Sequence, residues 1–387
     1  MNVIRAIMPL IAAYWCVGLH AGGFSTNGVA THAQSMQSAF VAIADDPSAV
    51  FYNPAGVAGL DGDQVLLNTF VIMPSIGFDS TRGRGDATSS RNGLGYSLFA
   101  TTDRLNALSF GFGVFSPFAR LTRYDVGPAV NNVDHSSRVL RVDVAPSVAK
   151  SWGNVSVGAG ASFGSVTLQS DVLGLREKGS GNGVAFQLGA LFKGDRFNVG
   201  FSARSPMTAR VKGSGTLRRS PAPTQRGKFK ADFRFPAMIS AGVAYRVRQD
   251  TVVSAALDWQ LWSSINTVRR RYIDNPILTE LAVNRVDADN SMTFRLGVRR
   301  ELAARWMFTA GYSYTQSAFA QARLVPAFPD FDAHAVSLGV GYFTKRFRVS
   351  IGYEFAISGA KVSNNPVFPG EYSLRANNLM LGLKARL

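Results

Sequence analysis

The chain has 387 residues, of which 46% are hydrophobic and 17% charged, and its formal net charge is +16. So much apolar surface excludes a disordered chain, and a single Cys excludes a disulfide scaffold or a Cys-rich metal site. The length suits a few ordinary domains or one large barrel, and the positive charge suggests a polyanionic partner such as nucleic acid or an acidic lipid.

Residues 1–21 are predicted to be a secretory signal peptide. Arg5 supplies a short basic region, the stretch from Ala6 to Leu19 is apolar, and Ala21 is a suitable last residue before cleavage. This stretch is shorter than the roughly 20 residues of a transmembrane helix, although a retained anchor remains the alternative. No later apolar run approaches that length either, so the sequence excludes a helical membrane protein.

Residues 22–63 are rich in small, polar and turn-forming residues and show no strand pattern. Their irregular backbone cannot face lipid, because its N–H and C=O groups would lack partners there. We therefore expect this segment to form a partly helical hatch that plugs the lumen of a barrel.

Residues 64–387 are predicted to form that barrel, because apolar residues alternate with polar or small ones in run after run. One such run is 346–358, in which the odd positions are Phe347, Val349, Ile351, Tyr353, Phe355 and Ile357. It is as long as a tilted transmembrane strand, which needs about 9–11 residues. The fold class is thus all-β, a 14-stranded antiparallel transmembrane barrel, with a soluble β-sandwich as the alternative.

Short turns alternate with long polar segments, as expected for an up-and-down barrel. The predicted long loops are 79–91, 120–137, 169–182, 206–230, 264–289, 317–331 and 359–373. Aromatic residues near the strand ends are expected to form interfacial girdles. These residues are Trp152, Trp262, Trp306, Tyr342 and Phe347.

The segment from Ala42 to Gly56 reads Ala-Ile-Ala-Asp-Asp-Pro-Ser-Ala-Val-Phe-Tyr-Asn-Pro-Ala-Gly and resembles the hatch signature of the FadL-type family (OmpP1/FadL/TodX). Weaker matches follow in the same order as in that family. They are Gly113 to Phe118 on the third strand, Phe294 to Gly297 on the tenth, and Pro329-Asp330 before the twelfth.

The resemblance implies an outer-membrane transporter of long-chain fatty acids or of aromatic and other hydrocarbons. It implies passive, diffusion-driven uptake, an apolar binding site, gating by the hatch and sideways exit near a kinked third strand. Pro117 supports the kink independently, because a proline removes a ladder donor. Alternatively, Pro117 ends the strand before the predicted loop 120–137.

The candidate site residues fall into three groups. The hatch candidates are Phe24, Asp45, Asp46, Asn53, Pro54 and Ala55. The candidates at the kink and lateral exit are Gly113, Phe115, Pro117 and Phe118. The lumen charges that could contact substrate are Arg295, Arg299, Asp258 and Arg141.

Each group has a functional and a purely structural interpretation. Phe24 fills the substrate pocket as a mobile plug or is ordinary packing, and the Asn53-Pro54 pair gates the pore or fixes a turn. The lumen charges pair with one another and with the hatch, or Arg295 binds a substrate carboxylate. No Lys or Arg occurs from Gly153 to Leu175, where fatty-acid members of the family carry basic residues, which favours a neutral apolar substrate.

Diffusive transport needs no catalytic residue, so we predict no enzyme activity, no metal and no cofactor. The expected partners are a hydrophobic small molecule (fatty acid or hydrocarbon), outer-membrane lipid and lipopolysaccharide, because much of the basic charge falls in the long loops; no nucleic acid is expected. We expect a monomer in the outer membrane of a Gram-negative bacterium. The alternative functions are a general solute porin and a secreted polyanion-binding protein.

Overall fold

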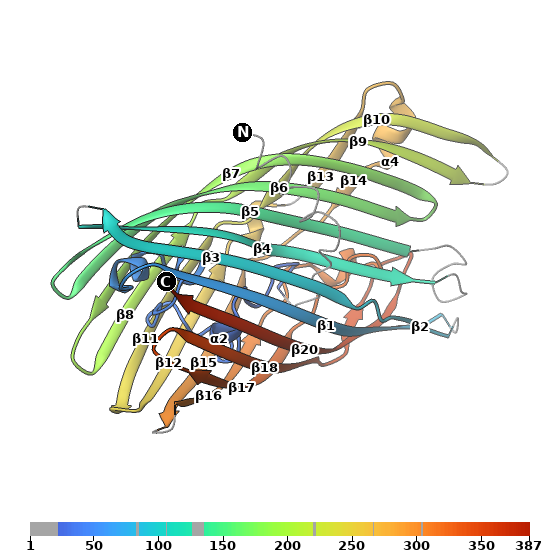
Figure 1. Ribbon diagram of the computed structural model, residues 1–387. Coiled ribbons are helices and arrows are strands. Elements are labelled where there is room, and N and C mark those ends of the chain that lie inside the picture. Colours follow the sequence, from blue (N-terminus) through green and yellow to red (C-terminus); the bar gives the residue numbers. More distant parts are fainter. Residues whose placement is uncertain are drawn as a thin grey trace.

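The computed structural model describes residues 22–82, 85–105, 107–125, 135–219, 222–265, 267–302 and 305–387. The predicted signal peptide lies outside these residues, as do residues 126–134 of the predicted loop 120–137. Within them, the strands form one antiparallel sheet that curls into a closed barrel (Figure 1). No helix in the described part of the chain is long and apolar enough to cross a membrane.

Fourteen strands close the barrel, as predicted. In order around the wall they are β1 (Gln64–Ser80), β3 (Gly93–Leu105), β4 (Leu108–Tyr124), β5 (His135–Trp152), β6 (Val155–Val172), β7 (Leu175–Lys193), β8 (Phe197–Arg204), β11 (Met238–Arg248), β12 (Thr251–Gln260), β15 (Ser291–Leu302), β16 (Trp306–Thr315), β17 (Ala333–Phe343), β18 (Phe347–Ser358) and β20 (Gly370–Arg386). β20 pairs with β1 along the whole length of β1, from Gln64 opposite Arg386 to Ser80 opposite Gly370.

Further strands extend the wall beyond the ends of several barrel strands. They are β2 (Asp86–Ser89), β9 (Met207–Arg219), β10 (Ala222–Phe235), β13 (Thr267–Tyr272), β14 (Val283–Arg285) and β19 (Lys361–Ser363). β9 continues β8 beyond Pro206, and β10 leads into β11 across Pro236. β7 spans both levels, because its C-terminal part pairs with β8 and its N-terminal part with β9.

The outward face of the barrel is apolar and exposed. Phe186, Leu188 and Leu338 are 62%, 63% and 66% exposed, whereas their chain neighbours Gln187 and Ser337 point inward and are buried. A continuous exposed apolar surface on a closed barrel is the surface that contacts lipid.

Two of the predicted loops are instead strands. Segments 169–182 and 206–230 were expected to be irregular, but β6, β7, β9 and β10 run through them, and the chain reverses sharply at Leu173 and Gly174. Above the lipid these strands carry charged side chains outward and small ones such as Gly179 and Gly213 inward. The apolar alternation by which the strands were recognised is therefore weak in β9 and in the N-terminal part of β7, whereas β10 keeps it with the apolar residues Phe229, Ala231 and Phe235 on the inward face.

The segment 22–63, which we name the hatch segment, lies within the barrel (Figure 1). It contains two short α-helices, α2 (Thr31–Gln34) and α3 (Ala49–Tyr52), and one 3₁₀ helix, η1 (Pro54–Gly59). Small lumen residues let it approach the wall closely. A Cβ added at Gly311 would lie 2.3 Å from the backbone of Met36.

Candidate functional site

Asn53 joins the hatch segment to the barrel wall. Its side-chain amide donates hydrogen bonds to the carbonyl oxygens of Val41, at 2.9 Å, and of Ala190 in β7, at 3.0 Å. Its Oδ1 accepts from the backbone N–H of Ala55 at 3.2 Å and so caps η1. Asn53 is fully buried, so one side chain satisfies groups of both the hatch segment and the wall.

Pro54 packs against two wall glycines. A Cβ at Gly158 of β6 would lie 2.4 Å from the carbonyl carbon of Pro54, and one at Gly189 of β7 would lie 2.2 Å from Oδ1 of Asn53. Ala55 beside it is completely buried. The Asn53-Pro54-Ala55 triplet therefore fits a part of the wall that has room only for glycine.

Asp45 and Asp46 make ion pairs to other strands of the wall than those that Asn53 and Pro54 contact. Asp45 accepts from Arg299 of β15 at 2.6 Å, and Asp46 accepts from Arg348 of β18 at 2.5 Å. Asp46 also accepts from both N–H and O–H of Ser48. These partners offset the cost of burying the carboxylates, so the pKa of Asp45 is lowered to about 2 and that of Asp46 falls well below its usual value.

His32 completes this group of charges. Its Nδ1 lies 3.1 Å from Asp46, and the ring is 3% exposed. Burial and the nearby Arg348 guanidinium lower the pKa of His32 from 6.5 to about 4, against the opposing effect of Asp46. The imidazole is therefore neutral at physiological pH, and Arg348 is the cation that balances Asp46.

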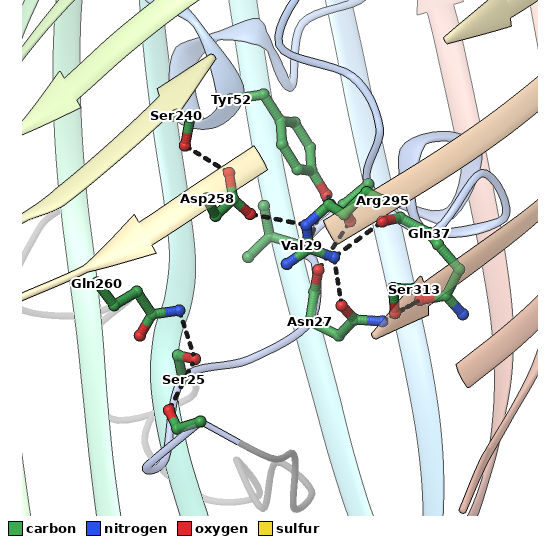
Figure 2. A network of polar contacts seen from close by, with 12 residues as sticks. Ser25, Asn27, Val29, Gln37, Tyr52, Ser240, Asp258, Gln260, Arg295 and Ser313 are labelled. Carbon is green, nitrogen blue, oxygen red and sulfur yellow. Dashed lines mark hydrogen bonds and ion pairs between the residues drawn. The ribbon is translucent and has the colours of Figure 1, made fainter. Parts of the chain in front are cut away.

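Arg295 ties the hatch segment to β12 and β15 (Figure 2). It donates to Asp258 at 2.7 Å, to the carbonyl oxygen of Gln37 at 2.8 Å and to Oδ1 of Asn27. Asp258 in turn accepts from Ser240 of β11 at 2.6 Å. Of the two interpretations of Arg295, the geometry favours the structural one, since its Nε and Nη1 donate to protein groups.

Arg141 has a similar arrangement in β5. It donates to Asp143 through Nε at 2.7 Å and through Nη2 at 2.6 Å, and both side chains are about 1% exposed. Its guanidinium carbon also lies 5.4 and 5.0 Å from the ring centres of Phe118 and Phe235. This pair carries little net charge and forms a wall of the pocket described below.

β4 bends at Pro117 but does not end there. Phe115 lies opposite Asp143 and Phe118 opposite Arg141, so Ser116 and Pro117 lie within a bulge. An extra residue shifts which side chains point inward: Gly113 and Phe115 face the lumen before the bulge, and even-numbered residues do so after it. Beyond Val114, β4 is no longer paired with β3, which leaves a break in the wall.

The start of the hatch segment occupies this break. Phe24 accepts from the N–H of Ala119 at 3.0 Å, Thr26 donates its N–H to Pro117 at 3.0 Å, and the Thr26 hydroxyl donates to Ser116 at 3.0 Å. Residues 24–26 therefore act as a short strand along the free edge of β4.

Phe24 places its ring in an apolar site that we name the aromatic pocket. Its walls are Phe118, Phe233, Phe235, Trp262 and Phe319, whose ring centres lie 5.0–6.5 Å from that of Phe24. Trp262 was expected in an interfacial girdle, but it is 1% exposed. The prediction fails because β12 ends at Gln260 and the chain turns inward at η3 (Trp262–Ser264).

Arg120 and Asp330 border the aromatic pocket and were not among the predicted site residues. Arg120 lies over the rings of Phe24, Phe319 and Phe328, and its Nε and Nη1 have no hydrogen-bond partner. Asp330 accepts from the N–H groups of Gly23, Ala318, Phe319 and Phe331, and burial raises its pKa. Placing 120–137 in a loop concealed Arg120, whereas Asp330 had appeared only as part of a weak family match.

The lumen is closely filled around this site. Cavities of about 20 Å³ lie beside Arg295 and at the break between β3 and β4, each large enough for about one water molecule. A third, of about 50 Å³, lies above the aromatic pocket and includes Phe233 and Phe328 among its lining residues.

The structure thus brings the predicted residues together in two places. Phe24, Pro117, Phe118 and Arg141 meet at the aromatic pocket, while Gly113 and Phe115 line the wall just below it. The hatch residues Asp45, Asp46 and Asn53 anchor to the wall, and Arg295, Arg299 and Asp258 belong to these anchors.

Comparison with known proteins identifies a protein family. The family model for outer membrane protein transport proteins (OMPP1/FadL/TodX) matches residues 15–174 and 167–377. A protein of Neisseria meningitidis serogroup B, named as an outer membrane protein, is 27% identical over 131 residues. That match takes in 31% of this chain and 28% of the relative's length.

Solved structures agree on the fold. A Pseudomonas aeruginosa FadL homologue superposes with a TM-score of 0.84 at 17% identity, covering 94% of this chain and 100% of that one. The toluene transporters TodX of Pseudomonas putida and TbuX of Ralstonia pickettii give TM-scores of 0.76 and 0.75, each at 17% identity and covering 93% of this chain and 99% of theirs.

Proposed function

The chain belongs to the OMPP1/FadL/TodX family of outer membrane transport proteins, and we propose that it carries out passive uptake of hydrophobic molecules through the aromatic pocket. The observation that carries this proposal is the position of the pocket. It is an apolar site inside the barrel, yet it borders the break between β3 and β4. A solute bound there is next to a passage through the wall.

Binding requires Phe24 to leave its place. The ring is held by aromatic contacts, and the chain around it by a few hydrogen bonds to β4. An apolar solute that enters from above, through the cavity lined by Phe233 and Phe328, can replace the same contacts. The exchange costs little, because one buried hydrocarbon surface is substituted for another.

Exit proceeds sideways between β3 and β4. A solute that passed down the lumen would meet the buried anchors of the hatch segment and then water. A solute that leaves through the wall enters hydrocarbon, which favours it by about 0.8 kcal/mol for each CH₂ group removed from water. The edge of β4 that β3 leaves unpaired, along which residues 24–26 lie, provides such a path.

The unpaired donors of Arg120 offer a way to distinguish two classes of substrate. A hydrocarbon leaves its Nε and Nη1 without partners, as they are now, whereas a fatty acid could offer its carboxylate to them. Comparing the affinity for hexadecanoic acid with that for hexadecane tests this directly. Equal affinities assign a neutral substrate, and a clear preference for the acid assigns a fatty acid.

The lumen does not support a general solute porin. The side chains of residues 29–57 are almost all buried, and the cavities beside Arg295 and at the break have room for about one water molecule each. Among the described residues, neither of these two cavities has room for a hydrated solute.

The decisive experiment compares apolar uptake with ionic conductance. Cells that lack other routes should accumulate labelled toluene or hexadecanoic acid when they produce this protein, and the purified protein should conduct ions poorly in planar bilayers. Deletion of residues 22–60 should open a large conductance. Strong conductance by the intact protein, or no uptake of either apolar probe, would overturn the proposal.

A further inference from the structure

The outward face of β7, β9, β10 and β13 carries a continuous array of cations. At alternate positions along each strand, exposed Lys and Arg side chains point away from the lumen. We name this array the basic surface; it consists of Lys178, Arg210, Lys212, Arg226, Lys228, Lys230, Arg234, Arg269 and Arg271. Asp232 is the acidic residue among them on β10.

Three of these cations are aligned across neighbouring strands. Lys230 of β10 lies directly opposite Lys212 of β9 on one side and Arg271 of β13 on the other. Side chains directly opposite one another in an antiparallel sheet are about 5 Å apart at Cβ, and like charges there are destabilising. Within the described part of the chain no ion-pair partner of these three is found, so their proximity favours the binding of an external anion.

The basic surface begins where the lipid-facing surface ends. Along β7 the outward side chains are Lys178, Ser180 and Asn182, followed by Val184 and Phe186, which are 45% and 62% exposed. Lys212 lies opposite Ser180, so it is only about 13 Å along the strand from Val184, at about 3.3 Å per residue. This is the height of lipid headgroups.

The basic surface also lies at the outer end of the barrel. Most of the tight turns, such as that between β5 and β6, are at the opposite end, while β9, β10 and β13 project at the end with the longer connections (Figure 1). In barrels of this kind the short turns face the periplasm, so these strands rise from the outer leaflet.

The basic surface includes a groove. It runs between β10 and β13, has a volume of about 650 Å³, and is lined by Lys230, Asp232, Arg234, Arg269 and Arg271 together with uncharged residues. That volume suits a small charged group with its sugar, since ligand sites commonly span about 300–1,000 Å³. Arg side chains match phosphate oxygens particularly well.

We propose that the basic surface binds the phosphate groups of lipopolysaccharide in the outer leaflet, with Lys212, Lys230 and Arg271 as its centre. Lipopolysaccharide is favoured over a soluble polyanion because the cations continue the lipid-facing wall at headgroup height and face sideways into the leaflet. This binding goes beyond the proposed uptake function and does not depend on it, since the aromatic pocket faces the lumen.

The test measures binding of purified lipopolysaccharide to the full-length protein in detergent, by native mass spectrometry and by titration at rising salt. The target variant is Lys212→Gln, Lys230→Gln, Arg271→Gln. The matched control, Arg248→Gln, Lys345→Gln, Arg346→Gln, removes the same charge from exposed positions at the tight-turn end. Far-UV circular dichroism checks that both fold, and the single variant Lys230→Gln serves if the triple variant does not.

We expect the native protein to bind phosphorylated lipopolysaccharide at least about tenfold more tightly than the enzymatically dephosphorylated form, with an affinity that falls as salt rises. The target variant should lose most of that preference and the control should keep it. Equal binding of the two lipid forms, or an equal loss in target and control, would overturn the proposal. So would tight binding of soluble heparin with none of lipopolysaccharide, because it would identify a different class of partner.

Discussion

Asp46 offers the sharpest test of how the hatch segment is held. The change Asp46→Asn preserves the size of the side chain and removes its charge. It leaves Arg348, whose side chain is 14% exposed, without the carboxylate that accepts from it at 2.5 Å. It also weakens the contact with His32 at 3.1 Å. The barrel strands themselves lose nothing, because no strand-to-strand hydrogen bond involves this side chain.

The expected cost follows from burial. Asp46 is completely buried, and removing one partner of a buried ion pair costs about 3–5 kcal/mol because the other charge is left uncompensated. Local opening of the hatch segment should therefore become roughly 10²- to 4 × 10³-fold more frequent, since each 1.4 kcal/mol is a factor of about ten. Global stability of the barrel should change far less.

Hydrogen exchange followed by mass spectrometry measures this opening directly. Peptides that cover residues 31–52 should lose protection in Asp46→Asn, while peptides from β17 and β18 keep theirs. The matched control is Asp287→Asn, which breaks an ion pair with Arg323 whose side chains are 46% and 37% exposed and which should have little effect.

The double variant Asp46→Asn, Arg348→Met completes the cycle. Removing both charges should restore much of the protection, because no uncompensated charge then remains. Unchanged protection in Asp46→Asn would refute the view that buried ion pairs anchor the hatch segment. If the loss of protection in the double variant equals the sum of the losses in the two single variants, the explanation by uncompensated charge is refuted.

Two further predictions concern the same segment. Asn53→Ala should slow uptake of an apolar substrate without changing barrel folding, because it removes the bonds to Val41 and Ala190 that hold this part of the hatch segment in place; unchanged uptake would contradict a role of Asn53 in transport. Acid should loosen the hatch segment in two steps. The pKa of His32 is about 4 in the closed segment and about 6.5 in the opened one, so between these pH values only the opened segment binds a proton at His32. The free energy of opening is therefore highest above pH 6.5 and falls by up to about 3 kcal/mol as the pH drops to 4. Asp45, lowered from 3.8 to about 2, contributes protection that is lost below pH 3.8. In hydrogen exchange, His32→Gln should remove the first step, whereas the exposed-site control His334→Gln should retain it.

The sequence predicts the barrel well because lipid imposes a strict rule on it. Every second residue of a spanning strand must be apolar, so runs such as 346–358 predict the strand and its faces together, and β18 occupies Phe347–Ser358. The same rule lapses outside the lipid. There the outward positions of β9 and β10 are charged and the inward ones are small in β9 or include Phe229 and Phe235 in β10, so no apolar outer face marks these strands and they were assigned to loops.

The candidate site was predictable only where a residue has a local role. Pro117 removes a ladder donor wherever it stands, so a bend at this position could be inferred. The partners of Arg295 could not, because Asn27 and Asp258 lie far away in sequence and meet only when the barrel closes. The aromatic pocket was hidden for the same reason, since Phe24, Phe118 and Trp262 come from three distant segments.

The two ends of the hatch segment are held by different forces, and this difference bears on how a substrate passes. Residues 45–55 are anchored by two ion pairs, of which that of Asp46 is buried, and by Asn53, and breaking the buried pair costs several kcal/mol. Residues 24–26 are held by the Phe24 ring, whose contacts an incoming apolar molecule can replace, and by a few hydrogen bonds to β4 rather than by ion pairs. We therefore expect transport to displace residues 24–26 while the anchors at 45–55 stay closed. A disulfide engineered between the 45–55 region and the wall should then leave uptake unchanged, whereas one that fixes residues 24–26 to β4 should abolish it.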